Sequence, residues 1–149
     1  MRSLSRSALI RLRLFGGGLS LIIDKWLSLQ AAIPEAATLE RVRALTSHLA
    51  FSMTNPNRIR ALIGSFAQAN HTQFNRIDGK GYDFVADIVL ALDSKNPQVA
   101  ARLTGAFRSW RALEPRRRER AERTLRRDAA APSLSRDVGD IVARTLSGG

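Results

Sequence analysis

The sequence contains no cysteine and only two histidines. Disulfides and thiolate metal sites are therefore excluded, and the lack of cysteine fits a reducing compartment, so we expect a cytoplasmic protein. His48 and His71 stand 23 positions apart, and neither begins an H-E-x-x-H motif. The sequence thus offers no metal-ligand pattern, and we expect no metal and no cofactor in this chain.

Long apolar runs and strand patterns are also missing. The most apolar stretch, LSLIIDKWLSL at 19–29, is interrupted by Asp24 and Lys25 and is shorter than the roughly 18 residues that span a bilayer. No membrane association is expected. Sustained alternation of apolar and polar residues is absent, as are Asn-Gly and Asp-Gly hairpin turns.

Motifs of common enzymes are absent as well. Gly64 and Ser65 do not complete G-x-S-x-G, and the glycines at 16–18 are not followed by the Gly-Lys-Ser/Thr of a phosphate loop. The stretch NRIDGKGYDF at 75–84 has too few oxygen ligands for a calcium loop. These absences argue against an autonomous enzyme.

Basic residues are abundant, and the formal net charge is +11. Lysine supplies three of the 24 basic residues and arginine the other 21. Such a charge is typical of nucleic-acid binding, but the arginines are spread along the chain. The densest run, 116–127, lacks aromatics, and its Glu119 and Glu122 precede Arg123 and Arg126 in the favourable i,i+4 order. We therefore expect no nucleic-acid partner, and a basic helical binding module for nucleic acid or another acidic partner stays as the alternative.

Helical periodicity dominates, because apolar residues recur at spacings of three and four. The pattern predicts an all-α fold with helices over 20–31, 34–45, 55–68, 82–94, 96–110, 114–128 and 133–147. In the first of these, the expected inward residues are Leu21, Ile22, Trp26 and Leu29. Between the third and fourth, residues 70–81 are predicted to form a loop ending in glycines.

Two phrases mark helix starts with unusual clarity. Asn55-Pro56 and Asn96-Pro97 each place an N-cap asparagine before a proline at the first helical position. Arginines follow one to two turns later in both phrases.

The first 20 residues differ from the rest. They contain Arg and Ser but no acid, as do transit peptides and weak secretory signals. We favour a short amphipathic helix or a loosely ordered segment over residues 1–20, followed by one helical domain over 21–149.

Four stretches carry a family resemblance that runs from Asp24 to near the C-terminus. They are DKWLSLQAAIPEAATLERVRAL, FSMTNPNRIRALIGSFA, GYDFVADIVLALDSKNPQVAARL and SLSRDVGDIVARTLS. Together they resemble the C-terminal helical domain of bacterial aminopeptidase N, a zinc-dependent aminopeptidase of the gluzincin clan. The resemblance implies a right-handed, armadillo- or HEAT-like stack of antiparallel helix pairs.

The resemblance also implies a role. In the family, the zinc site, the Gly-rich exopeptidase motif and the catalytic tyrosine lie in an upstream domain, so this chain alone is expected not to be an enzyme. It would be a detached lid and channel domain, partnered in cis or in trans with a catalytic domain that holds the zinc and binds peptides. Arg60, Gln98 and Arg102 match residues that line the family's substrate channel. The competing interpretation makes Arg58, Arg60 and Arg102 structural ion pairs or solvent-facing residues.

Overall fold

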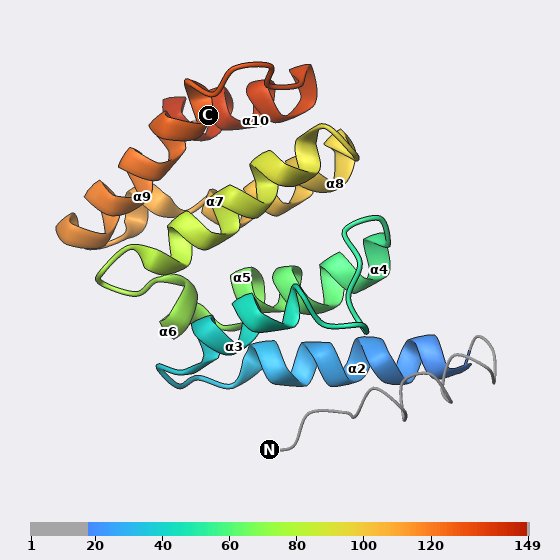
Figure 1. The fold of residues 1–149 in the computed structure, drawn as a ribbon. Helices are drawn as coiled ribbons and strands as arrows, with labels where there is room; N and C mark the ends of the chain where they lie inside the picture. The colour runs from blue at the N-terminus through green and yellow to red at the C-terminus, as the bar shows by residue number, and fades with distance from the viewer. Residues whose placement is uncertain (1–17, 149) are drawn as a thin grey trace.

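The computed structural model describes residues 18–148, and over that range every regular element is a helix (Figure 1). The predicted loose segment 1–20 lies mostly outside the described residues; its last three residues begin α2. The elements are α2 (Gly18–Ala32), α3 (Thr38–Leu45), α4 (Pro56–Ile59), the π-helical η1 (Arg60–Gly64), α5 (Ser65–Ala69), α6 (His71–Phe74), α7 (Lys80–Asp93), α8 (Pro97–Thr104), the 3₁₀ turns η2 (Gly105–Phe107) and η3 (Trp110–Ala112), α9 (Pro115–Ala129) and α10 (Arg136–Ser147).

The helices stack from one end of the molecule to the other in chain order. Figure 1 shows α2 along one end, α7 and α8 in the middle, and α9 and α10 at the opposite end. Helix α2 packs on α3 and on the continuous run 56–69, whereas α7 packs on α8 and α9, and α8 on α10. The predicted all-α class and armadillo-like stack are confirmed.

Aromatic side chains are few but concentrate where the two halves of the stack meet. Phe74 lies edge-on to Phe66, Tyr82 and Phe107, with ring centroids 5.1 to 6.5 Å apart. Edge-on contacts of this kind add about 0.5–1.5 kcal/mol beyond the buried area. This cluster joins α5, α6, α7 and η2 into one core.

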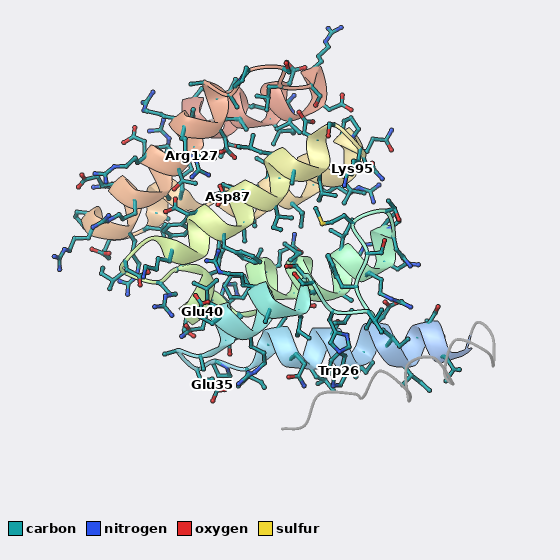
Figure 2. The ribbon with its side chains drawn as sticks, in the orientation of Figure 1. Trp26, Glu35, Glu40, Asp87, Lys95 and Arg127 are labelled. Carbon is teal, nitrogen blue, oxygen red and sulfur yellow. The ribbon has the colours of Figure 1, made fainter. Side chains whose placement is uncertain are left out.

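Ion pairs hold α9 against α7 at the surface. Arg127 Nη2 lies 2.8 Å from Asp87 Oδ1, and Figure 2 shows these two side chains facing each other across the helices. Within α9, the predicted i,i+4 pairs form: Glu119 with Arg123 at 3.1 Å and Glu122 with Arg126 at 2.9 Å.

The inward face predicted for α2 is wrong for three of its four residues, since only Trp26 packs against the core. Leu21, Ile22 and Leu29 are 72%, 56% and 53% exposed, while Ile23 and Leu27 are buried. The helix carries two apolar stripes at i,i+4 spacing, and periodicity cannot choose between them. The outer stripe leaves an apolar face at this end of the stack.

Helix boundaries also differ from the prediction. Helix α3 begins at Thr38, not at Pro34, because the buried Thr38 hydroxyl donates to the carbonyl of Ile33 at 2.5 Å and a bend and turn occupy 35–37. The predicted loop 70–81 contains α6, whose N-cap is Asn70.

The helix predicted over 96–110 ends early. Regular α8 stops at Thr104, and the 3₁₀ turns η2 and η3 carry Phe107 and Trp110 into the core. The apolar spacing thus correctly predicts that Phe107 and Trp110 are buried, although the α-helix gives way to 3₁₀ turns before them.

Candidate functional site: an arginine-lined groove

Asparagine side chains cap the first turns of α4 and α8. Asn55 Oδ1 accepts hydrogen bonds from the backbone N–H of Asn57 at 3.0 Å and of Arg58 at 3.3 Å. Asn96 Oδ1 accepts from Val99 N–H at 3.2 Å. Prolines follow each cap, at the position where a missing N–H costs nothing. These caps fix where α4 and α8 begin.

Helix α4 runs directly into the π-helical segment η1. Arg60 is the first residue of η1, and its Nη1 donates to Asn57 Oδ1 at 3.2 Å. A π-helical turn widens the helix and changes which residues share a face, and such turns are frequent at functional sites. No pattern in the sequence predicts this π-helical turn.

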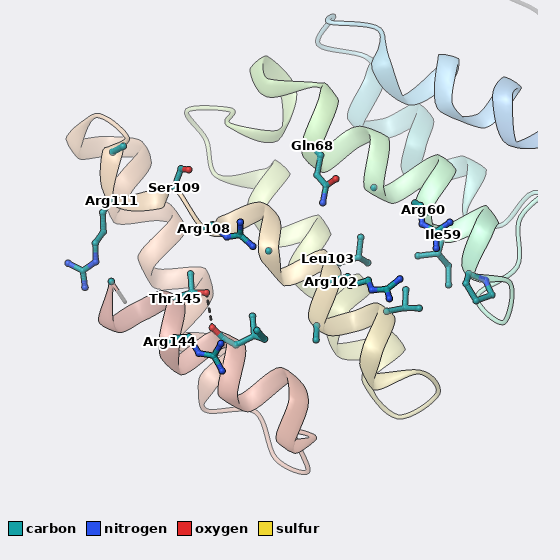
Figure 3. A pocket seen from close by; sticks show the side chains of 18 residues that line it. Ile59, Arg60, Gln68, Arg102, Leu103, Arg108, Ser109, Arg111, Arg144 and Thr145 are labelled. Atoms are coloured by element: carbon teal, nitrogen blue, oxygen red, sulfur yellow. Dashed lines mark hydrogen bonds between the residues drawn. The ribbon is translucent and has the colours of Figure 1, made fainter.

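A groove of about 950 Å³ opens between the run 56–69 and helices α8 and α10 (Figure 3). Its apolar surface comes from side chains such as Ile59, Val99, Leu103 and Ile141. Of the described residues, no acidic one lines it, whereas five arginines do: Arg60, Arg102, Arg108, Arg111 and Arg144. A groove lined by positive charges alone focuses the electrostatic field and attracts anions.

The five guanidinium groups are not equivalent. Arg111 donates to the carbonyl of Leu146 and lies over the Trp110 ring, 4.7 Å from its centroid. Arg102, Arg108 and Arg144 are exposed, and their side chains form no hydrogen bond or ion pair with the described part of the chain.

The groove brings together two of the three channel residues expected from the resemblance. Arg60 from η1 and Arg102 from α8 lie near each other at one end of it in Figure 3. Gln98 is exposed on the first turn of α8 and is not among the lining residues. Sequence reasoning missed Arg108 and Arg144, because nothing in their local sequence separates them from the other arginines.

Arg58 belongs to the structure and not to the groove. Its Nη1 lies 2.5 Å from Asp24 Oδ1, and its Nε donates to the carbonyl of Ala50 at 3.0 Å. The structural interpretation therefore holds for Arg58, while Arg60 and Arg102 face the groove.

A smaller hollow of about 510 Å³ adjoins the groove and shares Arg102 and Arg108 with it. Its wall includes Tyr82, whose hydroxyl donates to Asn75 Oδ1 at 2.7 Å. Burial raises the pKa of Tyr82 to about 12, so this phenol stays protonated near neutrality and does not serve as a general base.

The described residues offer no place for zinc. Within residues 18–148, no group of three or more His, Asp or Glu side chains is arranged to hold a metal ion. A catalytic zinc site needs three such ligands, so the side chains present do not fit one. The same part of the chain contains no helix long and apolar enough to cross a bilayer.

Comparison with known proteins agrees with the fold and with the resemblance. Residues 17–147 match the family described as domain of unknown function DUF3458_C, ARM repeats. The chain is 41% identical over 126 residues to aminopeptidase N of Caulobacter vibrioides and 40% identical over 127 residues to aminopeptidase N of Escherichia coli. Each match covers 85% of this chain and 15% of the relative.

A solved structure resembles the fold over almost the whole chain. It is that of Legionella pneumophila aminopeptidase A in complex with aspartic acid, with a TM-score of 0.83 and 31% identity, covering 96% of this chain and 17% of that one. The chain thus spans about 15% of the length of the curated relatives that it matches. It belongs to the DUF3458_C family of ARM-repeat domains, and it corresponds to the C-terminal domain of an aminopeptidase N-like protein.

Proposed function

We propose that this chain is the lid and channel domain of a zinc aminopeptidase: it covers the catalytic chamber and positions peptide substrates, and it supplies no catalytic residue. The observation that carries the proposal is the placement of Arg60 and Arg102 on one groove, each shortly after a capped helix start. Catalysis and zinc binding would belong to a separate catalytic domain, in cis or in trans, in the cytoplasm.

The groove has the chemistry that peptide positioning needs. A guanidinium offers several donors in a fixed plane and pairs well with peptide carbonyls and carboxylates. Arg102 has no competing partner among the described residues, and Arg60 is held only by a neutral amide. Gln98, on the exposed first turn of α8, would extend the polar surface beyond the groove.

The outer face of α2 supports docking to more of an aminopeptidase chain. Stacked helical repeats bury a shared core, and an end repeat that meets solvent carries a polar outer face. Here Leu21, Ile22 and Leu29 give that face an apolar character. A preceding helix pair or domain would cover it.

The alternative of a nucleic-acid or acidic-partner module rests on the net charge of +11. It is less well supported, because several arginines of α9 are already paired with carboxylates. Single-stranded nucleic acid also stacks on aromatic rings, and no aromatic side chain within residues 18–148 lines the groove.

A chimera tests the proposal. Residues 21–149 replace the matching part of Escherichia coli aminopeptidase N, and the hydrolysis of aminoacyl amides and of tripeptides is measured. We expect an active zinc enzyme, whereas the 149-residue chain alone should hydrolyse neither substrate and retain no zinc after dialysis. A folded but inactive chimera, or activity that copurifies with the isolated chain, would contradict the proposal.

A further inference from the structure

We propose that Arg108 and Arg144 form a second anion subsite in the groove, which binds a carboxylate of the peptide that Arg60 and Arg102 help to position. The inference rests on the proposed function, because it takes a peptide as the occupant of the groove. It adds a contact that selects for a carboxylate, at the end of the groove opposite Arg60 and Arg102.

The placement of the two arginines defines the subsite. Arg108 follows the 3₁₀ turn η2, and Arg144 projects from α10, yet both line the groove of about 950 Å³. In Figure 3 they lie toward one end of the groove, while Arg60 and Arg102 lie toward the other. A ligand along the groove would therefore meet separate positive charges at its two ends.

The charges of the subsite are not neutralised by the described protein. Elsewhere in the molecule, arginines such as Arg58, Arg76 and Arg126 pair with carboxylates at 2.5 to 2.9 Å. Arg108 and Arg144 have no such partner in residues 18–148. No acidic residue of that range lines the groove. An anionic ligand would gain charge-assisted hydrogen bonds from these unpaired guanidinium groups.

The rest of the groove favours a peptide over a nucleic acid. Aliphatic side chains such as Leu103 and Ile141 line it and suit amino-acid side chains, whereas base stacking needs aromatic surfaces that it lacks. Its volume of about 950 Å³ can hold a short peptide, since pockets for small ligands measure roughly 300–1,000 Å³.

The carboxylate has two possible sources, the C-terminus of a peptide and an Asp or Glu side chain. Three probes distinguish them: tetraalanine as the free acid, tetraalanine amide, and Ala-Ala-Ala-Glu amide. Each is titrated into the complete 149-residue chain, and the Nε–H signals of the arginines are followed by NMR.

We expect the free acid to bind about tenfold to a hundredfold more tightly than the neutral amide, as the loss of a charge-assisted hydrogen bond implies. The signals of Arg108 and Arg144 should move with it. If Ala-Ala-Ala-Glu amide binds as tightly as the free acid, the subsite accepts either a C-terminal or a side-chain carboxylate. If it binds as weakly as tetraalanine amide, the subsite accepts only the C-terminal carboxylate.

Matched variants separate this subsite from general charge. Arg108→Gln and Arg144→Gln remove exposed groups, and each should reduce the preference for the free acid severalfold. Arg123→Gln removes another exposed arginine, which lies on α9 outside the groove and pairs with Glu119, and should leave the preference unchanged. Equal binding of free acid and neutral amide, no detectable binding, or an unchanged preference in both groove variants would overturn the subsite.

Two outcomes point to other conclusions. Displacement of the peptide by octathymidylate at lower concentration would overturn the subsite in favour of nucleic acid. If the chimera is active but the isolated chain shows no carboxylate preference, the subsite alone is overturned. If the chimera is inactive but the isolated chain shows that preference, the proposed function alone is overturned.

Discussion

Arg58 Nη1 lies 2.5 Å from Asp24 Oδ1 and ties α4 to α2 across 34 positions of the chain. The same guanidinium reaches the carbonyls of Ser20 and Ala50. Two residues later, Arg60 is exposed and lines the groove. The phrase Asn-Arg-Ile-Arg therefore carries one arginine that is paired within the fold and one that lines the groove.

This division predicts different effects on stability. Arg58→Ala leaves Asp24 and two carbonyls without their donor and should lower the free energy of unfolding by about 2–4 kcal/mol. Arg60→Ala, the matched control, should change it by no more than about 0.5 kcal/mol. Urea denaturation followed by circular dichroism measures both, and equal effects would contradict the division of roles.

Much of the helical framework could be predicted because its signals are local. Asn55 and Asn96 cap helices through their own side chains, and the spacing of Ile59, Leu62 and Phe66 is enough to place them inside. A capping residue and an apolar stripe act within one or two turns, so the local sequence contains the necessary information.

Features that depend on distant contacts could not be predicted. Helix α2 is joined to α4 by the bond from Arg58 to Asp24, 34 positions apart, which no local pattern reveals. The groove requires Arg102 and Arg144 to approach from separate helices, and the π-helical turn depends on packing. Arg60 and Arg102 entered the prediction only through the family resemblance, which assigned no role to Arg108 or Arg144.

A second stability prediction concerns the contact between α6 and α7. A Cβ atom added at Gly81 would lie 2.4 Å from the carbonyl oxygens of Gln73 and Phe74. Backbone atoms cannot move aside as a flexible side chain can, so Gly81→Ala should force the helices apart and lower the free energy of unfolding by about 2–4 kcal/mol. Thermal unfolding gives the measurement.

Gly64→Ala is the control for this prediction. The added methyl group would meet only the Arg60 side chain, at 3.6 Å, which is an ordinary contact. Since alanine is favoured over glycine in helices by about 1 kcal/mol, stability should stay the same or rise slightly. A loss equal to that of Gly81→Ala would show that the carbonyl contact is not decisive.

A third prediction concerns pH. Asp128 is buried on α9, and burial raises its pKa to about 6, although Arg127 lies 3.3 Å away. The folded protein thus holds this proton more tightly than the unfolded chain does. The contribution of Asp128 to stability therefore falls as pH rises from about 4 to about 6.

Asp128→Asn removes the titration while keeping the shape of the side chain. At pH 7 the variant should be more stable by about 1–3 kcal/mol, and its advantage should shrink towards pH 4. Denaturation of both proteins at several pH values gives the difference. Asp140→Asn, at an exposed position of α10, is the control substitution. An advantage that is independent of pH would contradict the assignment to Asp128.

The last prediction concerns Arg102 in the active chimera. Leu103 is buried in the core and Val99 packs against it, and both border the groove, whereas Arg102 on the same helix is exposed in the groove. Arg102→Ala should therefore impair hydrolysis of tripeptides more than that of a single-residue amide, which is too short to reach the groove. If the contact is equally strong in the ground and transition states, KM rises about tenfold or more while kcat stays nearly unchanged. Arg123→Ala on α9 is the matched control, and identical tripeptide kinetics for Arg102→Ala and the parent chimera would exclude a role for Arg102 in positioning substrate.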